Sequence, residues 1–455
     1  MKDWRAYYRE HLVTTAEAAR QIKDGDVVWI GNGPQMPFTL LDEMHQHMED
    51  YHDVFFMWNV ATNPIPIFFD PATKGHFKLT SFFNLPLDRM SGEMGVMEYH
   101  SCGYDHMDES FFEYGGSVVA IHICPPDDEG WCNLGHYGVS TGSIVMNDPR
   151  VKLRIGFIDR TGQYPIPGEH HVVDVHVTDF DYLVECDTEL LEIIAPQPSD
   201  VDKLIAAQIM PYIHKNDTLE IGYGGLAEEI LANLHDVGPV DIYSEVVCDK
   251  MIDLIEEGVI TKAKACSPGA VSTRFFKFMS VDPRVQLLPR DKMINLFEIA
   301  KQDNLVAINA TLMVDLLGQA CSEAQGLKPY SGVGGSFAYV YGAMRSKGGR
   351  SFMCLRSTYH DEAGERHSNV VAWLPEGSIV TIPKNYQMYI VTEYGLADIY
   401  LKTMPDRIRA MIRIAHPDYR EGLKEKILTT SLVTERDFED YELFEQTAAP
   451  AAAEA

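Results

Sequence analysis

One block of the sequence occurs twice, and this repeat limits the possible folds more than any other feature. IKDGDVVWIGNG begins at Ile22, and IHKNDTLEIGYGG begins at Ile213. Each copy has the pattern of a helix, a tight turn, a strand, a Gly-rich loop and a second helix. A spacing this long indicates one α/β unit used twice and not a short solenoid repeat, with chance similarity as the alternative. The matched pairs include Asp26 with Asp217, Ile30 with Ile221, Gly31 with Gly222, Gly33 with Gly224 and Leu40 with Leu231.

Short apolar runs alternate with helical patterns along the rest of the chain. Runs that are apolar on both faces predict strands of largely parallel sheets in an α/β fold. Thr14 with Glu17, and Ser199 with Asp202, have capping-box spacing at helix starts. We expect two related α/β domains at 1–195 and 196–440 and a disordered tail at 441–455. The predicted strands are 26–31, 53–60, 117–124, 152–159, 218–222, 240–247, 305–315 and 389–395.

Charge and cysteine spacing exclude several classes of protein. The formal net charge of −29 disfavours a nucleic-acid partner, because such affinity needs clustered Lys and Arg. No apolar run approaches the ~18 residues of a membrane span, so we expect no membrane partner. The eight cysteines form no C-x-x-C pair, and no secretory apolar segment follows the charged start. We therefore expect a cytoplasmic protein with reduced thiols and no bound metal.

Two Gly-rich loops follow predicted strands in the second half of the chain. One is Gly222-Tyr223-Gly224-Gly225, and the other contains Gly332, Gly334 and Gly335. Consecutive backbone N–H groups in such loops can bind an anion, and glycine lets a ligand approach closely. Neither loop has the full spacing of a phosphate-binding signature. A tight strand-to-helix connection is the simpler reading of each loop taken alone.

Glu245 is the acidic residue best placed for chemistry. It lies in the apolar run VDIYSEVV, with a helix predicted from about Asp249. Ligands of parallel α/β sheets gather at the carboxyl ends of strands. Desolvation there would make a carboxylate more nucleophilic or raise its pKa. Capping or ion pairing is the alternative role for an acid in this place.

Three further patterns suggest other chemistry but have simpler explanations. Ser140 lies in a GxSxG match, yet turn-like residues precede it where a nucleophile elbow needs a strand. His170, His171 and His176 could share a metal, but residues 171 and 176 would face opposite sides of a strand. Lys347 lies beside glycines and is expected to be solvated.

Eight ordered blocks of the chain resemble the family I coenzyme A transferases, from about residue 10 to about residue 430. The resemblance is to the branch with butyryl-CoA:acetate, 4-hydroxybutyrate and acetyl-CoA hydrolase/transferase proteins. It implies two α/β domains of related topology. The blocks are AAxxIKDGDxVxIG (18–31), PPDDEGWCNLG (125–135), HVTDFDYLVE (176–185), IGYGGLAEEI (221–230), SEVVCDKMIDLIEEGVIT (244–261), YSGVGGSFAYVYGAMRSKGG (330–349), VTEYGLADIY (391–400) and IAHPDYR (414–420).

The resemblance also implies a mechanism and a set of site residues. Glu245 would attack the acyl-CoA thioester, and a glutamyl-CoA thioester would then carry CoA to the acceptor acid with ping-pong kinetics. The loop from Gly332 to Gly335 would stabilise the oxyanion, and the loop from Gly222 to Gly225 would contact CoA, with Gly342 nearby. CoA is then a substrate, and no tightly bound cofactor or metal is required. Ser336 departs from the family pattern, which often has Gln there.

The expected function is CoA transfer from a short-chain acyl-CoA, first butyryl-CoA, to a small carboxylate such as acetate. Donors with 4-hydroxybutyryl, propionyl or succinyl groups are alternatives within the class. A thioester hydrolase on the same scaffold is a further alternative, and a non-catalytic acyl-CoA-binding protein is the alternative from another class. The resemblance also implies a homo-oligomer.

Overall fold

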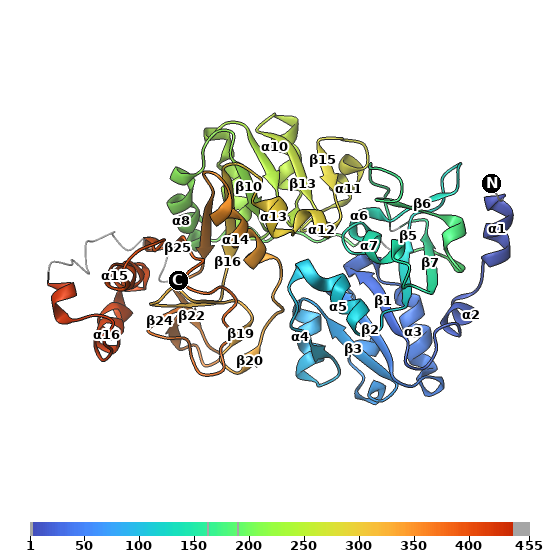
Figure 1. Cartoon of the computed structure of the whole chain (residues 1–455), viewed down its shortest axis with the longest axis horizontal. Helices are drawn as coiled ribbons and strands as arrows, with labels where there is room; N and C mark the ends of the chain where they lie inside the picture. The colour runs from blue at the N-terminus through green and yellow to red at the C-terminus, as the bar shows by residue number, and fades with distance from the viewer. Residues whose placement is uncertain (1–2, 162, 189–190, 440–455) are drawn as a thin grey trace.

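The computed structural model describes residues 3–161, 163–188 and 191–439, and it contains two large β-sheets (Figure 1). The first sheet holds seven strands that are all parallel to their neighbours. Their burial explains the apolar sequence: every residue of β1, β2 and β5 is buried. In spatial order the strands are β4 (Glu98–Tyr99), β3 (Phe77–Ser81), β2 (Val54–Asn59), β1 (Val27–Asn32), β5 (Val118–Ile123), β7 (Leu153–Asp159) and β9 (Tyr182–Cys186).

The second sheet repeats this strand order and adds one antiparallel edge strand. The repeated sequence blocks supply β1 and β10, which hold equivalent places in the two sheets. The predicted α/β class with largely parallel sheets is confirmed, and the strand order reproduces the internal repeat. In spatial order the strands are β15 (Val285–Leu287), β13 (Ile260–Ala265), β11 (Val240–Tyr243), β10 (Thr218–Ile221), β16 (Leu305–Ala310), β21 (Arg350–Cys354), β25 (Tyr389–Thr392) and β26 (Gly395–Asp398).

Helices cover the sheets, and several begin where the sequence predicts. Thr14 and Ser199 form the expected capping boxes with Glu17 and Asp202. Three predicted strands are instead interrupted, 240–247 at residues 244–245, 305–315 at 311–312 and 389–395 at 393–394. The main helices are α1 (Trp4–His11), α2 (Thr15–Ala19), α3 (Phe38–Gln46), α4 (Pro86–Glu93), α5 (Met107–Glu113), α6 (Gly135–Gly138), α7 (Gly142–Asn147), α8 (Asp200–Ile209), α9 (Gly225–Ala232), α10 (Lys250–Glu256), α11 (Thr273–Met279), α12 (Arg290–Met293), α13 (Leu296–Ile299), α14 (Ser336–Arg345), α15 (Met404–Ile414) and α16 (Pro417–Leu428).

Small sheets of two or three strands complete the fold around the two large sheets. They are β6 (Trp131–Asn133) with β8 (Asp174–His176), β12 (Val246–Val247) with β14 (Ser267–Pro268), β17 (Met313–Asp315) with β18 (Ala320–Cys321) and β24 (Val370–Val371), β19 (Ala324–Gln325) with β20 (Lys328–Pro329), and β22 (Thr358–His360) with β23 (Arg366–Ser368). Across the described ranges, no helix is both long and apolar enough to cross a bilayer. The tail predicted at 441–455 lies outside the described residues, and the domain division near residue 195 stays a prediction.

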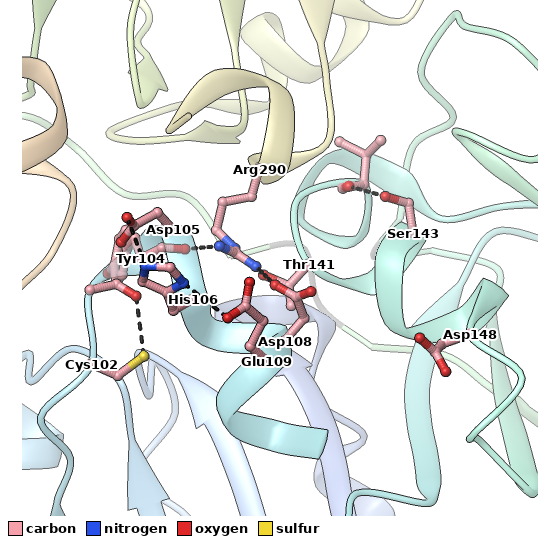
Figure 2. A network of polar contacts seen from close by, with 12 residues as sticks. Cys102, Tyr104, Asp105, His106, Asp108, Glu109, Thr141, Ser143, Asp148 and Arg290 are labelled. Carbon is pink, nitrogen blue, oxygen red and sulfur yellow. Dashed lines mark hydrogen bonds and ion pairs between the residues drawn. The ribbon is translucent and has the colours of Figure 1, made fainter. Parts of the chain in front are cut away.

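Polar contacts join the two sheet-bearing halves of the chain (Figure 2). Arg290 at the start of α12 is almost fully buried and bonds the carbonyl of Tyr104 and the carboxylate of Asp108. Its Nε also donates to the Thr141 hydroxyl at 3.3 Å. Because a buried guanidinium needs several acceptors, these bonds fix α12 against the first half. We call this set of contacts, from Arg290 to Tyr104, Asp108 and Thr141, the seam.

Candidate active site

Glu245 occupies the gap between β11 and β12, at the carboxyl end of β11. The preceding Ser244 is buried, and its hydroxyl donates to the Ile221 carbonyl at 2.7 Å and accepts the Ile221 N–H at 3.2 Å. The Glu245 carbonyl accepts N–H groups from Cys266 at 3.2 Å and Ser267 at 3.1 Å. These bonds hold the backbone of Glu245, and its side chain lines a cavity.

The environment of Glu245 favours a reactive carboxylate. Burial raises the pKa of Glu245 to about 7, while a hydrogen bond from the Gly335 N–H acts in the opposite direction. Gly335 lies so close that a Cβ on it would collide with Oε2 of Glu245. A carboxylate with little hydration is a stronger nucleophile than one in water, and near pH 7 a large share of it is ionised.

Two cavities meet at Glu245. The larger has a volume of about 540 Å³ and is lined by both Gly-rich loops and by the carboxyl ends of β10 and β16. The smaller, of about 90 Å³, lies between the ends of β1 and β2 and the segment from Cys266 to Gly269. A single ligand that extends through both cavities would therefore pass directly beside Glu245. The residues that line both cavities are Phe83, Leu85, Tyr223, Glu245 and Val246.

The smaller cavity contains polar groups that the protein itself leaves without a partner. Asn59 and Tyr137 line it and are both buried. Neither Oδ1 of Asn59 nor the hydroxyl of Tyr137 has a hydrogen-bond partner among the described residues. Buried polar atoms are rarely left unpaired, so a ligand with its own polar group fits this cavity.

The two predicted Gly-rich loops both reach the larger cavity, but not with every residue. Gly222 and Tyr223 line it from the first loop, and Gly332, Gly334 and Gly335 line it from the second, followed by Ser336. A Cβ on Gly332 would collide with the carbonyl of Phe82, so only glycine fits between the two halves there. The second loop thus lies beside Glu245, and its expected part in oxyanion stabilisation stays a prediction.

Gly224 and Gly225 belong to the first loop but do not line the larger cavity. Gly224 precedes α9 with φ of +117°, a conformation that favours glycine. Gly225 faces the side chain of Asp202, 2.6 Å from the position of an added Cβ. The expected contact of this part of the loop with CoA therefore stays a prediction.

Gly342, expected near CoA, is not among the residues that line the larger cavity. It is buried in α14, and a Cβ there would collide with Ile299 of α13. A close contact between two helices requires a small residue, which explains the glycine without a ligand. We leave Gly342 out of the proposed CoA site.

A Gly342→Ala substitution tests whether this glycine is needed for helix packing or for binding CoA. We expect it to lower the free energy of unfolding by about 1–3 kcal/mol, because the methyl group overpacks the α13–α14 contact. The KM for acyl-CoA of the remaining folded protein should stay unchanged. Thermal unfolding and steady-state kinetics measure the two effects, and a raised KM without loss of stability would return Gly342 to the binding site.

The other candidate groups differ in where they lie. Ser140 is buried and lines the smaller cavity, but a helix, α6, and not a strand precedes it, unlike the serine of a nucleophile elbow. His170 stacks on Trp131 and bonds Asp174 at 2.6 Å, while His176 meets the same indole edge-on and bonds Thr178 at 2.7 Å. His171 packs on the same indole ring. Lys347 is exposed.

Sequence reasoning missed a second acid in the larger cavity, Glu220. It lies on β10, and burial together with the charge of Glu245 raises its pKa to about 8. Its sequence signal was an acid in the otherwise apolar run TLEIG. Arg290, Asn59 and Tyr137 were missed because nothing in their own segments shows that they meet across the two halves.

Comparison with known proteins gives a consistent result. Residues 272–427 match the model of the acetyl-CoA hydrolase/transferase C-terminal domain. The chain is 31% identical over 432 residues to the 4-hydroxybutyrate coenzyme A transferase of Clostridium kluyveri, covering 92% of this chain and 98% of that one. It is 27% identical to the butyryl-CoA:acetate CoA-transferase of Anaerostipes caccae, covering 91% and 95%.

A solved structure has the same fold. RipA from Yersinia pestis superimposes with a TM-score of 0.85 at 25% identity, covering 95% of this chain and 100% of that chain. The family match and these relatives, together with the α/β fold, indicate an enzyme of the CoA-transferase and hydrolase class. The chain belongs to the acetyl-CoA hydrolase/transferase family of family I coenzyme A transferases.

Proposed function

We propose that this protein transfers CoA from a short-chain acyl-CoA to a small carboxylate through a thioester on Glu245. One observation carries the proposal: a glutamate with a raised pKa lies where a large and a small cavity meet. The larger cavity has room for the arm of CoA, and the smaller has room for a short acyl group. The thioester carbonyl between them would then lie at Glu245. Butyryl-CoA and acetate are the pair predicted from the sequence.

The reaction follows from the chemistry of three carboxylates. The Glu245 carboxylate attacks the thioester carbonyl, and a mixed anhydride forms as the carbon–sulfur bond breaks. The sulfur then attacks the γ-carbonyl of Glu245 and releases the first acid. The acceptor acid reverses both steps and leaves with CoA. Since each step exchanges one activated acyl bond for another, the cycle needs no separate energy source.

A backbone N–H beside Glu245 can stabilise the negative charge that develops during the reaction. The Gly335 N–H is directed to the Glu245 carboxylate and would stabilise negative charge on it or on the adduct. Binding of the CoA arm in the larger cavity can also favour the transition state, although that arm takes no part in bond breaking.

Borohydride trapping tests the proposal. The enzyme is mixed with butyryl-CoA without acceptor and treated with borohydride, and residue 245 is examined by mass spectrometry. We expect reduction of the glutamyl thioester at Glu245. An unmodified Glu245 in active enzyme would reject the mechanism. Continued release of CoA without acceptor would identify the hydrolase alternative.

A second candidate donor is a hydroxylated acyl-CoA, and the smaller cavity favours it. A hydroxyl on the acyl chain could donate to Oδ1 of Asn59 and accept from Tyr137, the two atoms left without partners. The relative from Clostridium kluyveri is named for 4-hydroxybutyrate. A site with unpaired polar groups discriminates against a substrate that lacks the matching hydroxyl.

A Tyr137→Phe substitution separates these two donors. We expect the kcat/KM ratio of 4-hydroxybutyryl-CoA to butyryl-CoA to fall about 5- to 10-fold, the value of one hydrogen bond. Stability should not fall, because the hydroxyl has no partner in the described part of the chain. Tyr114→Phe, at an exposed tyrosine, is the control. An unchanged ratio would favour an unsubstituted acyl chain.

We also propose a homo-oligomer in solution, as the family resemblance implies. Sedimentation velocity at micromolar concentration checks this, and a single species at the 51.2 kDa chain mass would contradict it.

A further inference from the structure

Glu220 is a buried carboxyl group that the cycle above does not use. It lies on β10 with 4% of its surface exposed and lines the larger cavity. Its Oε2 accepts the Asn309 side-chain amide at 2.7 Å and the Ile308 N–H at 3.2 Å, both from β16. Within the described ranges, no hydrogen bond is made to Oε1. The carboxyl group is thus held in one orientation with one oxygen available to a ligand.

The surroundings of Glu220 keep it neutral at pH 7. Burial is the first cause of its raised pKa of about 8, and the neighbouring charge of Glu245 is the second. Tyr339 of α14 and Cys354 of β21 also face it, and burial raises their pKa values so that both stay uncharged. Two carboxylates in one poorly solvated wall repel each other, so the pair holds one proton when Glu245 is ionised.

The raised pKa of Glu220 is not offset by a cation of the larger cavity. Arg89 is the one cationic residue among the described residues that line the larger cavity. Its guanidinium lies over the Tyr330 ring at 4.2 Å and donates to the Asn84 carbonyl at 3.0 Å. It does not contribute to the pKa of Glu220.

The two cavities place Glu220 on one particular side of the reacting bond. Glu245 lines both cavities, whereas Glu220 lines only the larger one. On the proposed function, on which this inference rests, the acyl group occupies the smaller cavity and the CoA arm the larger. The sulfur atom of CoA then lies on the side of Glu220.

We propose that Glu220 is a catalytic acid and base that gives a proton to the CoA sulfur and takes it back within each half-reaction. In the first step, Glu245 attacks the thioester carbon and a carbon–oxygen bond forms. The carbon–sulfur bond breaks with its electron pair on sulfur, and Glu220 transfers its proton there. The products are the mixed anhydride, the CoA thiol and ionised Glu220.

The second step returns the proton. Ionised Glu220 removes it from the thiol as the sulfur attacks the γ-carbonyl of Glu245, and the first acid leaves as its carboxylate. Glu220 is again neutral and the glutamyl-CoA thioester is complete. An acid close in pKa to a thiol of about 8.5 can transfer a proton in both directions without a large barrier.

The test measures how fast Glu245 becomes a thioester at each pH, by rapid mixing with acyl-CoA and borohydride trapping. In the wild-type enzyme we expect the rate to fall above about pH 8, where Glu220 is ionised before the attack. In Glu220→Gln we expect a rate about 100-fold lower, the size of a general acid effect, with no fall at high pH. Glu228→Gln, outside the lining of both cavities on α9, is the control and should keep the wild-type profile.

The outcomes separate this inference from the proposed function. If wild-type enzyme forms no thioester at Glu245, the proposed function fails and this inference fails with it. If it does, and Glu220→Gln keeps the rate or the fall at high pH, only the role of Glu220 is overturned. Should Glu220→Gln not fold, infrared spectra of the wild-type enzyme give a second test. A protonated carboxyl band that persists above the titration of Glu245 and disappears near pH 8 supports the role, and its absence rejects it.

Discussion

Replacing Glu245 by Gln should reduce CoA transfer by at least about 10⁴-fold, the scale seen when a covalent nucleophile is removed from an enzyme. The amide has the same shape but cannot form the anhydride or the thioester. Binding of acyl-CoA should persist, because both cavities keep their lining. Steady-state assays of transfer and calorimetric titration with butyryl-CoA measure the two effects. Transfer within tenfold of the wild-type rate would exclude Glu245 as the nucleophile.

The same variant shows the thermodynamic cost of a buried acid. The pKa of Glu245 is raised from 4.5 to about 7, so the folded state binds more protons than the unfolded state between these values. The wild-type protein therefore loses stability as the pH rises through this range. Glu245→Gln should unfold at a higher temperature than wild type at pH 8, and the difference should close near pH 4.5. Wild-type transfer should also decline below about pH 7, where Glu245 becomes protonated.

Gly335→Ala should reduce kcat about 100-fold while the fold is retained. The backbone at Gly335 has φ of −100° and ψ of −5°, which alanine adopts without strain. The added methyl group would collide with Oε2 of Glu245 and push the carboxylate away. Misplacement of a reacting atom by about 1 Å can cost this much. Kinetics and circular dichroism of the purified variant measure both quantities.

Gly422→Ala provides the matched control for Gly335→Ala. Gly422 lies in α16, and an added Cβ there meets no atom within 4 Å. We expect unchanged transfer and a gain in stability of up to about 1 kcal/mol from helix propensity. Full activity of Gly335→Ala beside this control would show that Glu245 moves freely, and the proposed contact would be wrong.

Local sequence patterns predicted much of the fold. The apolar runs of β1, β2 and β5 are buried on both faces, and that burial is what makes them continuous in sequence. The two capping boxes depend on residues three apart and form as expected. The interruption at Ser244 and Glu245 was not predicted, because it depends on hydroxyl bonds to Ile221 on another strand.

The sequence predicted some of the residues that line the two cavities and missed others, and the difference has a physical cause. Glu245 and the second Gly-rich loop belong to segments whose residue types are unusual for their positions. The role of Gly342 could not be assigned from the sequence, because a helix contact and a ligand contact both select glycine. Glu220 was missed because an acid in a short strand gives no local sign of which cavity it faces. The smaller cavity was beyond sequence reasoning, since its walls come from both halves.

The seam has a consequence for how the enzyme fails on heating. The Gly334 carbonyl accepts the Tyr104 N–H at 3.2 Å, and Arg290 bonds the Tyr104 carbonyl from the other side. The Gly-rich loop beside the nucleophile is thus bonded through Tyr104 to the half of the chain that contains the first sheet, although Glu245 follows a strand of the second. Thermal inactivation should therefore follow whichever sheet melts first, and a mutation far from Glu245 that weakens the first sheet should shorten the lifetime of activity.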